Sequence, residues 1–204
     1  MIAILDYGLG NIKAFAAVFH KLGVEYRIAR DATELSSASK IVLPGVGAFD
    51  KAMSLLNESG MRDTVQERVA MDGMPILGIC VGMQILAQNS EEGKLAGLGF
   101  IEGSVRSIAS LAGTQGLDLP HMGWNTVQFT PGERLAAGLS DPPEFYFLHS
   151  FYFDCTREED VVARVNYGAT FPCAVRRGNV YGVQFHPEKS HHNGVAILKN
   201  FAEL

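Results

Sequence analysis

The segment that decides the fold of this 204-residue chain is Pro75-Ile76-Leu77-Gly78-Ile79-Cys80-Val81-Gly82-Met83-Gln84. Its apolar start at 75–79 predicts a buried strand, and the run 83–87 predicts a helix. The pattern Gly-x-Cys-x-Gly between them is typical of a tight strand-to-helix turn, because small residues on both sides of the cysteine permit close backbone approach. Such a turn presents the Cys80 sulfur at the carboxyl edge of a parallel sheet, where the helix N-terminus favours the thiolate. Taken alone, the segment is equally compatible with a buried structural cysteine.

Strands and helices alternate in the sequence on the N-terminal side of this turn. A helical periodicity follows Asn11, a candidate N-cap, and stops at Gly23. Strands are expected at 2–5, 24–28 and 40–43, and helices at 12–22 and 61–70. This alternation predicts a parallel sheet with helices on its faces.

Short strand-like runs dominate the sequence on the C-terminal side. They lie at 100–108, 125–129, 145–153, 161–166 and 174–185, the last broken at 177–179. A final helix is expected at 195–201, introduced by Ser190 or Asn193. The fold class is therefore α/β, with a central, mostly parallel sheet flanked by helices and a more antiparallel C-terminal half. Because neither a linker nor a repeat interrupts the chain, we expect residues 1–204 to form a single domain.

The composition excludes several classes of function. The chain has 22 Asp and Glu against 17 Lys and Arg, a net charge of −5, and no basic run, so we expect no nucleic-acid partner. No apolar stretch reaches the roughly 18 residues of a membrane span, which predicts a cytoplasmic protein with no membrane partner. Three cysteines without a Cys-x-x-Cys pair and histidines without zinc spacing predict no metal. Gly8-Leu9-Gly10 lacks the third glycine of a dinucleotide fingerprint, so no cofactor is expected.

A base and an orienting group for a cysteine nucleophile are present in Gln184-Phe185-His186-Pro187-Glu188, 106 residues after Cys80. In an extended segment, positions 186 and 188 share a face, so Glu188 can hold the His186 imidazole while its other nitrogen faces the sulfur. Donors for a developing oxyanion are available from the backbone N–H groups of Val81 and, in Pro44-Gly45-Val46-Gly47, of Val46. Gly45 is expected to allow rotation of the Gly45–Val46 peptide, so that alanine there would slow turnover but spare alkylation of Cys80.

Together, the segments GICVGMQ, PGVG and QFHPEKS resemble the class I glutamine amidotransferases over essentially the whole chain. The segments PHMGWN at 120–125 and FYFLHS at 145–150 are similar to those of the glutaminase subunits of imidazole glycerol phosphate synthases. The resemblance implies Cys80 as nucleophile, His186 as base and then acid, and Glu188 as its orienting group. It implies hydrolysis of L-glutamine to glutamate and ammonia through a γ-glutamyl thioester.

Further residues follow from the same resemblance. Glutamine would be held by Gly47, Gln84 and the backbone around Ser150. The ammonia would pass to a (β/α)₈-barrel cyclase subunit, adding lyase to hydrolase chemistry in a heterodimer of histidine biosynthesis. Residues at family positions near that partner are Asn11, His121, Trp124 and Lys189.

Three alternatives remain open at this point. Leu148, where the family usually has valine, together with the aromatic run 151–153 and residues 190–194, resembles a paralogous branch that feeds ammonia to amidino-sugar synthesis for surface polysaccharide. A cysteine-elbow hydrolase of the protease or deglycase type would share the sheet but consume no glutamine. A silent binding module would have lost the triad, all three residues of which are present.

Overall fold

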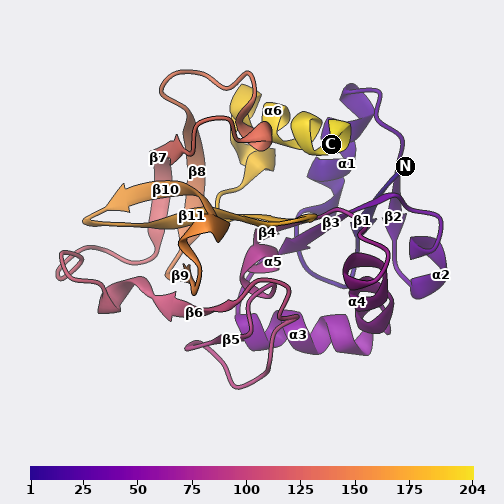
Figure 1. Ribbon diagram of the computed structural model, residues 1–204, viewed down its shortest axis with the longest axis horizontal. Coiled ribbons are helices and arrows are strands. Elements are labelled where there is room, and N and C mark those ends of the chain that lie inside the picture. Colours follow the sequence, from indigo (N-terminus) through magenta and orange to yellow (C-terminus); the bar gives the residue numbers. More distant parts are fainter.

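A nine-stranded mixed sheet forms the centre of the protein, in the order β2-β1-β3-β4-β12-β11-β10-β7-β8. The computed structural model describes residues 1–204 (Figure 1). The strands of this sheet are β1 Ile2–Leu5, β2 Tyr26–Ala29, β3 Lys40–Gly45, β4 Ile76–Cys80, β7 His121–Phe129, β8 Glu144–His149, β10 Val161–Tyr167, β11 Ala169–Arg177 and β12 Val180–Val183. A smaller sheet contains β5 Asn89–Ser90, β6 Gly103–Ser107 and β9 Phe151–Cys155.

The two halves of the large sheet differ in strand direction. Strands β2, β1, β3, β4 and β12 run parallel, and β11, β10, β7 and β8 continue the sheet with antiparallel pairings. Every residue of β1 and β4 is buried, as expected where helices cover both faces of a parallel sheet. In β8 the side chains alternate instead, with Phe145, Phe147 and His149 inside.

Helices cover both faces of the parallel half. Figure 1 shows α1 (Ile12–Lys21) and α6 (His191–Glu203) on one face of the sheet, and α3 (Phe49–Glu58) and α4 (Arg62–Ala70) on the other. The remaining helices are α2 Ala32–Leu35 and α5 Val81–Gln84. The predicted α/β class with a large, helix-flanked sheet is thus confirmed.

Several predicted elements differ from the structure. Helix α3 was not expected, although Phe49, Ala52, Met53 and Leu56 have helical spacing and are all buried. The predicted strand 145–153 is two strands in different sheets, because the chain leaves the large sheet at Ser150. Strand β12 is parallel to β4, so the antiparallel expectation is wrong for this one strand.

The ends of two helices also need correction. Asn11 occupies the N-cap position of α1, but its side chain makes no capping hydrogen bond. Helix α6 begins four residues before position 195, and Asn193 lies inside it, with its side chain bonded to Ser140 and the Glu144 carbonyl.

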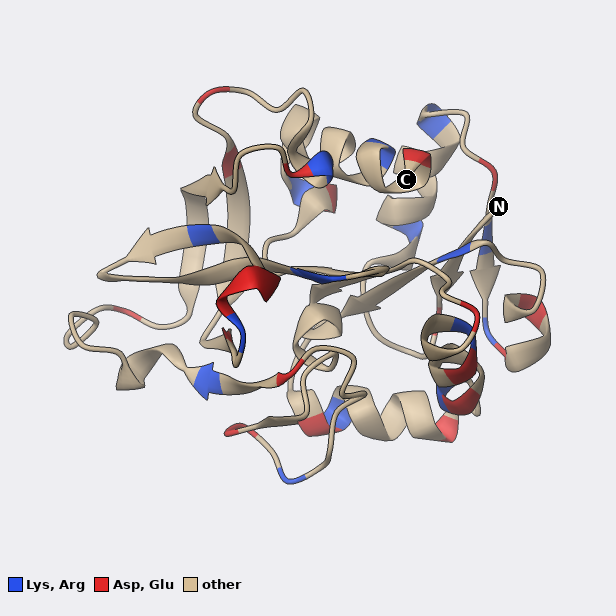
Figure 2. Ribbon diagram, viewed as in Figure 1, with Lys and Arg blue, Asp and Glu red and all other residues tan.

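Charged residues of both signs are interspersed along the chain, mainly in helices and loops (Figure 2). None of the helices combines the length and the apolar character that crossing a bilayer requires.

Candidate active site

Cys80 lies in a strained turn between β4 and α5. Its φ of 56° and ψ of −116° are unfavourable for a residue with a side chain, and such strain persists only where packing enforces it. Here the packing comes from glycines. A Cβ on Gly78 would lie 2.5 Å from the Gly82 carbonyl oxygen, and one on Gly82 would lie 1.9 Å from that of Leu43. The glycines therefore let the turn press against its own strand and against β3.

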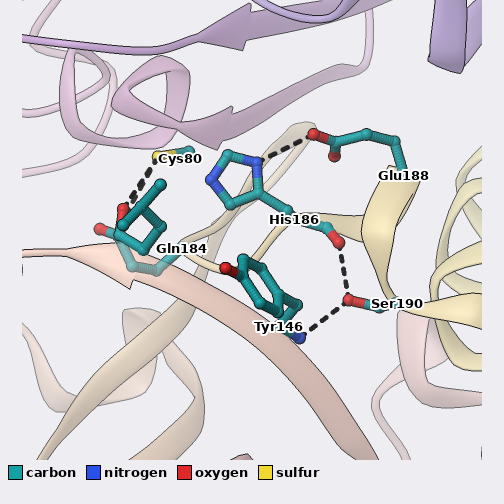
Figure 3. A network of polar contacts seen from close by, with 7 residues as sticks. Cys80, Tyr146, Gln184, His186, Glu188 and Ser190 are labelled. Atoms are coloured by element: carbon teal, nitrogen blue, oxygen red, sulfur yellow. Dashed lines mark hydrogen bonds and ion pairs between the residues drawn. The ribbon is translucent and has the colours of Figure 1, made fainter. Parts of the chain in front are cut away.

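His186 and Glu188 follow β12, which pairs directly with β4. The His186 Nδ1 lies 2.9 Å from the Glu188 Oε1, and both side chains are almost wholly buried. The segment Pro187–Lys189 forms a 3₁₀ turn rather than the extended segment expected, so Glu188 reaches the ring across one tight turn. The backbone N–H of His186 donates to the Tyr146 carbonyl, and the Ser190 hydroxyl donates to the His186 carbonyl (Figure 3).

The His186 ring is oriented toward Cys80. Because Nδ1 is held by the carboxylate, a neutral ring carries its proton on Nδ1, and Nε2 is left as an acceptor. The Nε2 atom is buried without a hydrogen-bond partner, and Figure 3 shows the ring next to the cysteine. Burial lowers the pKa of His186, but the Cys80 thiol and the Glu188 carboxylate outweigh burial and raise it to about 9. The ring is therefore a strong proton acceptor for a thiol.

Two further polar groups contact the sulfur. The Leu148 carbonyl oxygen lies 4.0 Å from the Cys80 Sγ, and the Gln184 Nε2 lies 3.8 Å from it. Gln184 was not expected at the site, although it stands two residues before His186. Sequence gives little reason to select it, because its contact depends on the pairing of β12 with β4.

The Pro44–Gly47 segment ends β3 beside the nucleophile. Gly45 is the register partner of Cys80 in the neighbouring strand. Beyond it, Val46 is 39% exposed, and Gly47 has a φ of 84°, which strongly favours glycine. The structure thus places Val46 and Val81 together at the nucleophile.

A pocket of about 350 Å³ opens over this group. All three residues predicted to bind the substrate line it, together with the nucleophile, the histidine and both valines. The complete lining is Val46, Gly47, Cys80, Val81, Gln84, Glu92, Pro120, Leu148, His149, Ser150, Phe151, His186 and Lys189. Glu92 and His149 were not expected. The pocket brings together a nucleophile, a base and candidate oxyanion donors that are far apart in sequence.

His149 belongs to a buried histidine pair at the pocket wall. Its Nδ1 lies 2.7 Å from the Phe151 carbonyl oxygen and therefore carries a proton, which leaves Nε2 to accept from the His121 Nδ1 at 2.9 Å. Burial is the main cause that lowers the pKa of His121 to about 4 and of His149 to about 3. The prediction that His121 faces a partner needs correction, because this residue is only 3% exposed and stacks between Phe147 and Tyr167.

The other three predicted interface residues are exposed. Asn11 lies at the start of α1. Trp124 is 46% exposed and stacks on His191 at 5.0 Å between ring centroids. The Lys189 ammonium lies 5.4 Å from the ring centroid of Tyr146, the register partner of Trp124. Trp124 and Lys189 thus form an aromatic and basic surface adjoining the 3₁₀ turn that holds Glu188.

Comparison with known proteins gives consistent results. The family model described as glutamine amidotransferase class-I matches residues 3–204. Proteins named imidazole glycerol phosphate synthase subunit HisH from Bdellovibrio bacteriovorus and Leptospira interrogans are 54% and 50% identical over 204 residues, and the matches cover 100% of this chain and of each relative.

Solved structures show the same fold. A crystal structure of glutamine amidotransferase has a TM-score of 0.74 at 22% identity, covering 100% of this chain and 99% of that one. A putative GMP synthase protein from Thermoplasma acidophilum has a TM-score of 0.72 at 25% identity, covering 99% and 92%. By its family match and its full-length relatives, the chain belongs to the class I glutamine amidotransferases.

Proposed function

We propose that this chain is the glutaminase subunit of an imidazole glycerol phosphate synthase, with Cys80, His186 and Glu188 as its catalytic triad. The observation that carries the proposal is the His186 ring, held at Nδ1 by Glu188 and facing Cys80 with an unbonded Nε2 in the pocket. The high identity to full-length relatives of that name supports the choice of reaction.

The chemistry follows from this arrangement. Glutamine lies between Gly47, Gln84 and the Ser150 backbone, with its amide carbon at the Cys80 sulfur. The thiol proton passes to the His186 Nε2 as the sulfur attacks, and the oxyanion of the tetrahedral intermediate takes hydrogen bonds from the Val46 and Val81 N–H groups. Collapse transfers the proton to the leaving nitrogen, which departs as ammonia. Water, deprotonated by His186, then hydrolyses the γ-glutamyl thioester to glutamate and restores the thiol.

The ammonia passes to a (β/α)₈-barrel cyclase subunit, which docks on the surface formed by Trp124 and Lys189. The lyase chemistry associated with the resemblance is not this chain's, because the groups assembled here serve amide hydrolysis. A single domain in the cytoplasm, as the sequence predicts, forms part of the proposal.

A coupled assay tests this function. We expect the isolated chain to release glutamate slowly from glutamine, and the cyclase subunit with its own ligand bound to raise the rate about a hundredfold. That gain needs about 2.7 kcal/mol of extra transition-state stabilisation, within the contribution of one oxyanion donor. No glutamate release with the partner present would refute the proposal, and full turnover without it would refute the coupling.

The surface-polysaccharide branch remains the second candidate, but no observation on the structure favours it. Restoration of growth without histidine in a strain lacking its own glutaminase subunit separates the two branches. A hydrolase of another class, or a silent module, is separated by the same glutamate assay, and the assembled triad argues against the silent module.

A further inference from the structure

Gln184 is a fully buried polar residue at the nucleophile to which the proposed mechanism assigns no role. It follows β12 directly, is 0% exposed, and its backbone N–H donates to the Cys173 carbonyl. Its side chain reaches the Cys80 sulfur, and Figure 3 shows both residues beside the His186 ring. A buried amide must satisfy both its nitrogen and its oxygen, so its orientation carries information.

The orientation of this amide is determined by its neighbours. The Gln84 Nε2 lies 3.3 Å from the Phe151 carbonyl oxygen, which can only accept, and this contact fixes which end of Gln84 is the nitrogen. The same nitrogen lies 3.0 Å from the Gln184 side-chain oxygen. The NH₂ group of Gln184 must therefore point at the Cys80 Sγ, and a flipped amide would place two acceptors or two donors together.

The two neutral neighbours of the sulfur favour opposite protonation states. The Leu148 carbonyl can only accept, so it favours the thiol, which can donate to it. The Gln184 amide donates, and a donor binds a thiolate more strongly than a thiol.

The titratable groups around the sulfur are His186 with its partner Glu188, from the turn after β12, and Tyr7, from the segment after β1. His186 takes up the thiol proton. Tyr7 donates to the Pro44 carbonyl at 2.6 Å, and burial raises its pKa, so it stays neutral. Gln184 is thus the only side-chain amide that donates to the sulfur.

We propose that Gln184 is a thiolate-stabilising residue, which donates its amide N–H to the Cys80 sulfur in an orientation set by Gln84. This inference deepens the proposed function and rests on Cys80 as its nucleophile. The hydrogen bond offsets the preference of the Leu148 carbonyl for the thiol, so that the sulfur is ready to attack when His186 accepts its proton.

Alkylation by iodoacetamide across a pH series tests the proposal, with modification of the peptide containing residue 80 followed by mass spectrometry. Gln184→Met keeps the volume but removes the donor. We expect the midpoint of the rate profile to move up by about one pH unit, so that the rate below the midpoint falls about tenfold while the high-pH plateau stays at the wild-type value. Gln184→Glu, which keeps the shape and the bond from Gln84, should shift the midpoint at least as far. It carries the test if the methionine variant does not fold.

Gln128→Met on the exposed side of β7 is the matched control and should leave the profile unchanged. An unmoved midpoint in a folded Gln184 variant overturns the proposal, as does an equal loss of rate at every pH, which would indicate a purely structural role. Because alkylation needs neither glutamine nor the cyclase, this failure is distinct from a failure of the proposed function, which would show as no glutamate release by the wild-type chain.

Discussion

Gly45 and Cys80 are register partners in the parallel strands β3 and β4, and a Cβ on Gly45 would lie 2.3 Å from the Gly82 backbone nitrogen. The end of β3 and the nucleophile turn are therefore packed backbone to backbone. Glycine is required at position 45 by this close approach, and the freedom of its peptide to rotate is not the first effect that a substitution would report.

Gly45→Ala should accordingly damage the nucleophile turn itself. We expect a loss of about 1–3 kcal/mol in the free energy of unfolding, as for an overpacked core, and slower alkylation of Cys80 as well as slower turnover. This replaces the expectation that alkylation would be spared. Gly47→Ala is the matched comparison, because its Cβ would meet nothing within 4 Å. It should lose about 1 kcal/mol from its positive φ and reduce turnover with little effect on alkylation. Equal alkylation rates in the two variants would contradict the packing argument.

Replacing the nucleophile should separate strain from chemistry. Cys80→Ala is expected to stay folded and to lose glutamine hydrolysis entirely, while added ammonia still supports synthesis by the cyclase. Cys80→Gly should be at least as stable as Cys80→Ala, because glycine adopts the φ of 56° without strain. Urea unfolding compares the two variants. Glutamate release by folded Cys80→Ala above a few per cent of wild type would exclude Cys80 as the nucleophile.

The raised pKa of His186 predicts a loss of stability at alkaline pH. A proton bound more tightly in the folded than in the unfolded protein stabilises the fold fully below about pH 6.5, and this stabilisation disappears as the pH rises through about 9. Glu188→Gln removes one cause of the raised pKa, so the decline between these values should become shallower by roughly 1–3 kcal/mol in total. The measurement is denaturant unfolding at several pH values. Parallel curves for the two proteins would show that the carboxylate does not hold the ring.

The buried His121–His149 pair predicts the opposite pH effect. Both pKa values are lowered, so the unfolded chain binds more protons below about pH 6.5, and each histidine removes about 1.4 kcal/mol of stability per pH unit down to its folded pKa. His149→Leu should make the acid decline shallower. It also removes a donor to the Phe151 carbonyl at the pocket wall, so we expect the KM for glutamine to rise about tenfold. His20→Leu on the exposed end of α1 should change neither quantity.

The exposed tryptophan predicts where the cyclase docks. Trp124→Ala should weaken binding of the partner by roughly 2 kcal/mol, or about thirtyfold in Kd, because large aromatic anchors dominate interfaces. Glutamate release by the isolated chain should remain as it was. Met71→Ala, at an apolar residue that is 80% exposed after α4, is the control. Titration calorimetry measures both, and equal loss of affinity would place the interface elsewhere.

Local sequence determined the elements that build the site. The apolar run before Cys80 and the glycines around it specify the turn, because a buried parallel strand and a glycine-dependent conformation both leave signals within ten residues. The pairing of His186 with Glu188 is also local, although a 3₁₀ turn and not an extended strand brings them together.

Tertiary structure alone decided which of these elements meet. Insertion of β12 between β4 and β11 brings His186 and Gln184 to Cys80, and nothing in the periodicity of residues 180–183 names β4 as their neighbour. The break at Ser150, the burial of His121 and the contact of Gly45 with Gly82 have the same origin. Each depends on atoms far apart in the chain, whose approach is selected by packing the whole sheet between its helices.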